Sequence, residues 1–219
     1  MKWLLGCLVA AALGSAGKAA AQERSPVQGQ GWSATSGGTV GDKQAVLLLN
    51  GGWPGISATA LYGFRPDIDL GVRASLNYGF EGLVNAELAA GIRAQGVARK
   101  RLLTSGNLTL GAEASPGLLF YFPEPGFTLT GITLPLVANA GVQVSSALLL
   151  NFSVSLPMYV TFGVLGGFTF PILAGAGAEY FLTQTTAITV NTRAGPSLST
   201  ESGQAGFAFE LLVGAAFKL

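Results

Sequence analysis

The stretch FAFELLVGAAFKL, residues 207–219, decides the fold of this chain. Its odd-numbered residues are all apolar, from Phe207 to Leu219, whereas the even-numbered residues include Glu210 and Lys218. Because successive side chains of a β-strand point to opposite faces of a sheet, this alternation predicts a strand with one apolar face and one mixed face. The apolar face of such a strand covers a protein core or contacts lipid. The composition of the other strands distinguishes these two possibilities.

The same alternation recurs along most of the chain. It predicts nine strands, over residues 56–64, 68–78, 83–95, 108–122, 132–144, 147–162, 168–182, 186–198 and 207–219. The apolar run 44–50 supplies a tenth strand, in keeping with the even strand count of single-chain bacterial barrels. Eight strands is the alternative. The residues between 95 and 107, with Arg99-Lys100-Arg101, are expected to form a polar connection on the periplasmic side.

The mixed face of these strands favours lipid as the partner of the apolar face. It carries mainly Gly, Ser, Thr and Asn, and only 11% of all residues are charged while 49% are hydrophobic. A surface in water usually has about 25–35% charged residues, so a soluble lipocalin-like barrel with its apolar face inward is disfavoured. Since open sheet edges cannot exist in lipid, we expect an all-β fold, a closed antiparallel up-and-down transmembrane β-barrel over residues 44–219.

Transmembrane helices are the other interpretation of a long uncharged segment. Residues 125–178 contain no charged side chain. A helical span needs about 20 consecutive apolar residues, and prolines interrupt this segment repeatedly. Its apolar pattern has a period of two rather than 3.6, which again predicts strands.

The N-terminal residues have the pattern of a secretory signal peptide. Lys2 precedes an apolar run over residues 3–13, and Ala19-Ala20-Ala21 is a cleavage site of the A-x-A kind. We expect residues 1–21 to direct export and to be removed, together with Cys7, the only cysteine. A lipoprotein signal ending at Cys7 is the alternative, although the apolar run would then follow the cysteine. Residues 22–43 are rich in Gly, Ser, Gln and Thr, which predicts a flexible periplasmic leader.

Charged residues on the mixed face are expected to form a network in the lumen. Its nine members are Asp69, Arg73, Glu87, Arg93, Glu113, Glu179, Arg193, Glu210 and Lys218. Unpaired charges are costly in a narrow interior, so they should form salt bridges that largely fill it. Reflecting adjacent strands about their turns predicts three pairs: Arg73 with Glu87, Arg93 with Glu113, and Arg193 with Glu210.

The residue types exclude several kinds of chemistry. The chain has no histidine, which rules out Ser-His-Asp and Cys-His nucleophilic catalysis and histidine metal sites. A carboxylate pair drawn from Glu87, Glu113, Glu179 and Glu210 could still act in acid–base catalysis. We expect no catalytic residue, cofactor or metal. The near-neutral charge also gives no electrostatic basis for binding nucleic acid.

The signal peptide, the repeated alternation and the last strand together resemble the small outer-membrane β-barrel proteins of Gram-negative bacteria. The likeness covers roughly residues 44–219. Gly214, Phe217 and Leu219 are similar to that family's C-terminal assembly signal, although Leu219 replaces the usual terminal aromatic residue and Leu212 stands where a polar residue is common. The resemblance implies a location in the bacterial outer membrane, with outer-membrane lipid and the insertion machinery as partners.

These features favour a non-enzymatic integral outer-membrane protein, either structural or a narrow passive pore with a salt-bridged lumen. A barrel that binds a lipid or a small apolar ligand at its mouth or wall is the alternative. An outer-membrane enzyme that works without histidine is a more remote alternative.

Overall fold

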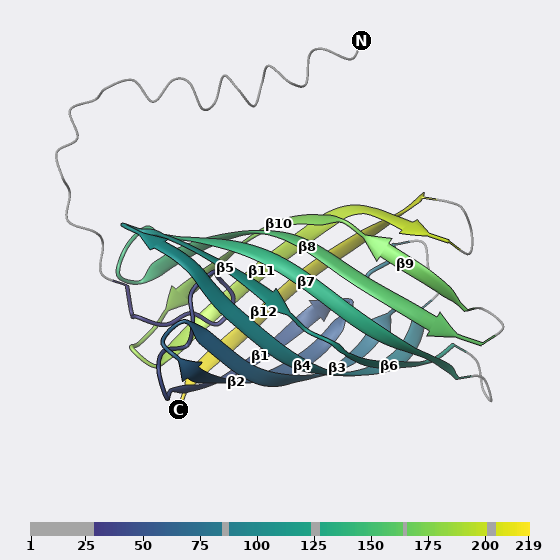
Figure 1. Ribbon diagram of the computed structural model, residues 1–219, viewed down its shortest axis with the longest axis horizontal. Coiled ribbons are helices and arrows are strands. Elements are labelled where there is room, and N and C mark those ends of the chain that lie inside the picture. Colours follow the sequence, from purple (N-terminus) through teal and green to yellow (C-terminus); the bar gives the residue numbers. More distant parts are fainter. Residues whose placement is uncertain (1–28, 85–87, 124–127, 164–165, 201–204) are drawn as a thin grey trace, which may run out of the picture.

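The computed structural model describes residues 29–84, 88–123, 128–163, 166–200 and 205–219 (Figure 1). These residues form one antiparallel sheet of twelve strands. The strands are β1 (Ala45–Trp53), β2 (Gly55–Arg65), β3 (Ile68–Gly79), β4 (Leu88–Ser105), β5 (Leu108–Ala114), β6 (Gly117–Phe122), β7 (Leu129–Gln143), β8 (Leu148–Phe162), β9 (Gly167–Pro171), β10 (Leu173–Phe181), β11 (Thr186–Ser199) and β12 (Ala205–Lys218). Within the described residues, no helix is long and apolar enough to span a membrane.

Hydrogen bonds between neighbouring strands run round a complete ring. The ring passes from β1 through β2, β3, β4, β5, β7, β8, β10, β11 and β12, and it closes where β12 pairs with β1 from Val46 opposite Lys218 to Trp53 opposite Leu211. Strand β6 pairs with β4 and β7, as β5 does, and β9 pairs with β8 and β11, as β10 does. These two short strands therefore continue β5 and β10 toward the end of the ring that lies away from Leu219.

The number of strands corrects the sequence prediction of ten, because two of the predicted strands are each interrupted once. The strand predicted over residues 108–122 is broken at Ser115-Pro116, and that over 168–182 is broken after Pro171. Proline has no N–H to donate to the ladder, so a strand readily ends or bends there. The prediction of a connection between residues 95 and 107 is also wrong. Strand β4 continues to Ser105, and Arg99-Lys100-Arg101 lies on it.

The two faces of the ring differ as the alternation predicts. Large apolar side chains lie exposed on the outside; Val72, for example, is 63% exposed and Val213 52%. Side chains of the opposite parity point inward, and among them Thr59, Asp69 and Thr189 are almost completely buried. In β12 the apolar stripe from Phe207 to Phe217 faces outward, while the side chains between are buried, as for Ala208 and Ala216, or half-buried.

The segment before β1 lies inside the ring. Residues 29–43, which we call the plug segment, enter at the end where the C-terminus lies, here called the C-terminal end (Figure 1). Trp32, Ser33, Ser36 and Val40 are buried against the inner wall. Of the residues predicted to form a flexible leader, 22–28 lie outside the described residues, and most of 32–40 are buried inside the ring. Small polar residues suit a polar interior as well as they suit a disordered chain, and composition alone does not separate the two.

Candidate functional site

The interior of the ring gathers the charged residues that the alternation predicts to face inward. Asp69 and Arg73 lie on β3, Arg93 on β4, Glu113 on β5 and Glu179 on β10. Arg193 lies on β11, and Glu210 and Lys218 lie on β12, with Lys218 at the last position of that strand. Glu87 lies outside the described residues.

Four ion pairs lie in the interior among the described residues, and the one between Arg99 Nη1 and Asp69 Oδ2, at 3.7 Å, lies beside the plug segment. Arg193 Nη1 lies 3.3 Å from Glu210 Oε2, and the two residues are directly opposite on β11 and β12, as predicted. Arg73 Nη2 lies 2.9 Å from Glu113 Oε1. Arg93 Nη1 lies 2.8 Å from Oε2 of Glu81, a residue that the sequence prediction did not include.

The other predicted pairs are wrong because two turns lie elsewhere than assumed. Arg73 is opposite Gln95 on β4, which shifts the β3–β4 pairing by several residues from the predicted register. Arg93 is opposite Leu119, and the residue opposite Glu113 is Arg99. Some ion pairs in this interior join neighbouring strands, as with Arg193 and Glu210, whereas the pair of Arg73 on β3 with Glu113 on β5 joins strands that are not hydrogen-bonded to each other.

Glu179 holds the beginning of the plug segment. Its carboxylate is fully buried and accepts four hydrogen bonds. The donors are Ser33 Oγ at 2.7 Å, the backbone N–H of Ala34 at 3.2 Å, and both the N–H and Oγ1 of Thr35 at 2.6 Å. Several donors are needed because a buried carboxylate is very costly without them.

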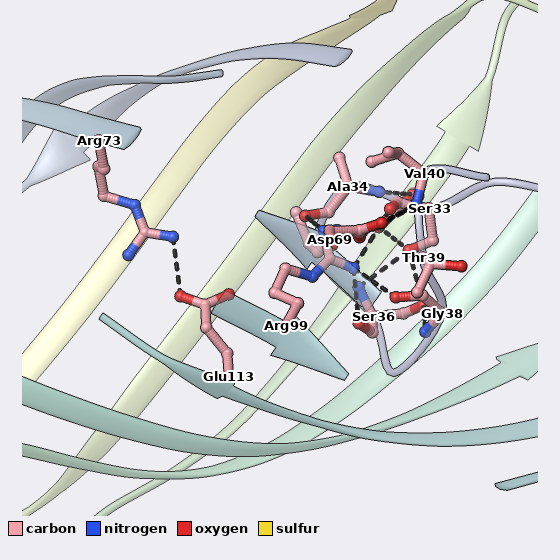
Figure 2. Close-up of polar contacts among 12 residues, drawn as sticks. Ser33, Ala34, Ser36, Gly38, Thr39, Val40, Asp69, Arg73, Arg99 and Glu113 are labelled. Carbon is pink, nitrogen blue, oxygen red and sulfur yellow. Dashed lines mark hydrogen bonds and ion pairs between the residues drawn. The ribbon is translucent and has the colours of Figure 1, made fainter. Parts of the chain in front are cut away.

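Arg99 and Asp69 hold the rest of the segment (Figure 2). The Arg99 guanidinium donates to four backbone carbonyls of the plug segment, among them Ala34 O at 2.9 Å and Ser36 O at 3.2 Å; the others belong to Ser33 and Gly38. Asp69 accepts from the N–H of Val40 at 3.1 and 3.2 Å. The segment thus forms a loop around the Arg99 side chain. Many of its backbone N–H and C=O groups form hydrogen bonds with charged side chains of the surrounding strands rather than with the backbone of a neighbouring strand.

Trp32 anchors the loop to the rim of the C-terminal end. Its ring packs edge-on against Phe181, with a centroid distance of 5.2 Å, and its Nε1–H donates to the carbonyl of Gln184 at 2.9 Å. Val40, at the other end of the loop, is buried in the same apolar cluster, which also includes Leu48 and Phe181.

The opposite end of the ring, here called the far end, is filled by an aromatic cluster. Phe80 packs against Tyr121 and Tyr159, with centroid distances of 4.7 and 5.8 Å. Beside it, Glu81 is buried and accepts from Tyr121 Oη at 2.7 Å in addition to its ion pair with Arg93.

Between the loop and this cluster lies a polar cavity of about 100 Å³. Its lining includes Thr35 of the plug segment and the ion-paired residues Arg73, Arg93, Arg193 and Glu210. Each of these arginines has a carboxylate partner. The space suits a few water molecules rather than an open aqueous channel.

The carboxylates do not form an acid–base pair in the described part of the chain. Glu113 is bound to Arg73, Glu210 to Arg193, and Glu179 to the plug segment. Within the described residues, no group of three or more His, Cys, Asp or Glu side chains is placed to hold a metal.

The residues similar to an assembly signal lie where the ring closes. Gly214 is opposite Asn50 of β1, and a Cβ atom added there would lie 2.3 Å from the carbonyl oxygen of Leu49. Phe217 and Leu219 lie on the outer face, and both are exposed.

Arg99 and Glu81 are the functional residues that sequence reasoning missed. Arg99 has the same parity as Arg93 and Gln95, so extending the alternation of β4 by a few residues would have placed it inside. Glu81 lies in a turn, where alternation carries no information.

No known family model matches this chain, and no curated protein is significantly similar to it. Its function must be inferred from the residues and their arrangement.

Proposed function

We propose that this chain is an integral outer-membrane β-barrel without catalytic activity, either structural or a narrow passive pore, whose salt-bridged lumen is held shut by its own N-terminal segment. The observation that carries the proposal is the distribution of side chains across the ring. The outside exposes Val72, Leu76, Val213 and many other large apolar side chains, whereas the inside buries the ion-paired charges.

This distribution suits lipid outside and not water. A soluble protein rarely exposes an apolar patch larger than a few hundred Å², and here apolar side chains recur on the outer face of strand after strand. A ring without free edges also satisfies the backbone hydrogen bonds that lipid cannot satisfy. The export signal expected over residues 1–21 and the resemblance of the last strand to an assembly signal favour the bacterial outer membrane.

The filled interior favours a closed resting state. The plug segment lies in the C-terminal end, the Phe80 cluster lies in the far end, and a small polar cavity lies between them. A protein arranged in this way is expected to conduct rarely or not at all until one end opens.

The decisive experiment is expression of the full chain in a Gram-negative host, followed by fractionation. The protein should stay in the outer membrane after a high-salt wash, should need detergent for extraction, and should migrate faster on gels when unheated than when boiled. Recovery in the soluble fraction without detergent, with no change of mobility on heating, would refute the proposal. Conductance in planar bilayers then separates a structural barrel from a pore.

Lipid binding at the outer wall is a second candidate function, favoured by one feature. A groove of about 510 Å³ crosses β4, β5, β7 and β8, with Ala98, Ala112, Ala114 and Ala138 along its floor and Lys100 beside them. A lipid that is retained through purification and identified by mass spectrometry, and that is lost in the groove-filling variant Ala112→Leu, would support it. Equal lipid content in the two proteins would reject it.

A further inference from the structure

Arg99 stands between two sets of acceptors. On the wall it is directly opposite Asp69 of β3 and directly opposite Glu113 of β5. Its guanidinium nevertheless donates to the carbonyls of the plug segment, and its distance to Asp69 Oδ2 is 3.7 Å, longer than a hydrogen bond (Figure 2).

Both carboxylates have hydrogen-bond partners other than Arg99 in this arrangement, although Asp69 also keeps its 3.7 Å ion pair with Arg99. Asp69 accepts from the backbone N–H of Val40 in the plug segment. Glu113 accepts from Arg73 Nη2 at 2.9 Å and from Ser115 Oγ at 2.8 Å. If the plug segment withdrew, Arg99 would lose its carbonyl acceptors and Asp69 would lose its N–H donor at the same moment. The two groups already form an ion pair at 3.7 Å, so a small movement of the freed guanidinium would bring them within hydrogen-bond distance.

Glu179 has no such second partner among the described residues. All the hydrogen bonds to its carboxylate come from Ser33, Ala34 and Thr35 of the plug segment. Its charge therefore stabilises only the closed arrangement, whereas the charge of Arg99 is satisfied whether the plug segment is in or out.

The connection to the sheet also permits withdrawal. Among the described residues, the backbone of the plug segment bonds to the backbone of a strand only near its end, where the N–H of Lys43 donates to Gly63 O at 2.8 Å. Just before it, Gly41 has a φ of 101°, a left-handed conformation that favours glycine. Residues 29–40 can leave the interior by rotation near Gly41 without breaking a strand pairing.

We propose that the plug segment is a reversible gate, bound inside the ring by Glu179 and released at the C-terminal end, and that Arg99 acts as a latch that exchanges the carbonyls of the segment for Asp69 and Glu113. This inference rests on the proposed barrel function. Opening exposes the polar inner wall of the C-terminal half to water and enlarges the central cavity toward that end.

Thiol labelling tests the exchange without requiring conduction. Ser36 is 2% exposed in the closed arrangement, so in a Cys7→Ser chain the variant Ser36→Cys should react slowly with a membrane-impermeant thiol reagent. Adding Glu179→Gln should accelerate that labelling at least tenfold. The matched control is Ser105→Cys at the exposed end of β4, whose rate should be the same with and without Glu179→Gln.

A disulfide lock is the second measurement. A Cβ atom built on Gly141 of β7 lies 2.9 Å from Ser36 Cβ, somewhat closer than the roughly 3.5–4.5 Å of a disulfide, so a small outward shift of the loop allows the bond. In planar bilayers the oxidised Ser36→Cys/Gly141→Cys protein should stay silent, and a reductant should produce openings at the frequency of the single variants.

The outcomes separate the two proposals. Equal conduction of the oxidised and reduced lock, or a labelling rate that Glu179→Gln leaves unchanged in a heat-modifiable membrane protein, overturns the gate and leaves the barrel intact. A protein that is soluble and not heat-modifiable overturns both.

Discussion

Arg99 and Glu113 are directly opposite each other on β4 and β5, yet Glu113 forms its ion pair with Arg73, two strands away from it in the ring. Arginine is long enough to reach past the intervening strand, and Arg99 is engaged by the plug segment. Which residues form ion pairs inside the ring therefore depends on the plug segment that lies there as well as on the register of the strands.

The Arg73–Glu113 pair gives the first prediction. Arg73→Ala leaves Glu113 without its arginine in a largely buried position, so the protein should lose up to about 3–5 kcal/mol of stability. The double variant Arg73→Ala/Glu113→Ala should recover much of that loss. Urea titration of the detergent-solubilised protein, followed by the heat-modifiable band, measures both. A double variant no more stable than the single one would show that the pair does not matter.

Trp32 gives a prediction that distinguishes the plug segment from the wall. Trp32→Ala removes the edge-on contact with Phe181 and the hydrogen bond to Gln184 O. Truncating a buried tryptophan usually costs about 3–5 kcal/mol of stability. Here we expect the loss to weaken the binding of the plug segment inside the ring and to leave the folding of the strands unchanged. Labelling of Ser36→Cys should become faster, while the temperature at which the folded band disappears should stay within a few degrees of that of the parent. A matching fall in that temperature would mean that the plug segment is part of the folding core.

The outer face gives a prediction about lipid. Val213→Arg places a charge on the exposed apolar face of β12, which costs about 2–4 kcal/mol near the middle of a bilayer. Folding into lipid vesicles should weaken accordingly, and less protein should reach the outer membrane. Gln184→Arg, on the exposed turn between β10 and β11, is the control and should behave like the parent. Equal folding of the two variants would argue that the apolar face does not contact lipid.

The pairing of β12 with β1, which closes the ring, gives a fourth prediction. Gly214→Val would drive its side chain into the carbonyl oxygen of Leu49 and the side chain of Asn50, so β12 and β1 should no longer pair cleanly. Overpacking of this kind costs about 1–3 kcal/mol. The heat-modifiable fraction should fall, and Ala215→Val, whose side chain points outward, should leave it unchanged. Normal assembly of Gly214→Val would mean that the ring still closes when β12 and β1 are pushed apart at this position.

Much of the wall could be predicted from the sequence because strand geometry is local. Alternation alone places Phe207 and Val213 on one face and Glu210 on the other, since neighbouring side chains point to opposite faces. The scarcity of charges on the mixed face then favoured an apolar outside. The pairing of Arg193 with Glu210 followed as well, because their strands are joined by one short connection whose position the sequence marks. The pairing of Arg73 with Glu113 could not follow, because it depends on the distance across the interior between strands that are not neighbours.

The sequence by itself determined that this chain forms strands with one apolar face and one polar face, through a period of two that needs no tertiary contact, and the few charges on the polar face favoured an apolar outside. Only the tertiary structure decided what fills the interior. Residues 33–40 have the composition of a disordered leader, and they acquire a fixed conformation because Glu179, Arg99 and Asp69 converge from three different strands to satisfy their backbone groups. That convergence exists only once the ring has closed.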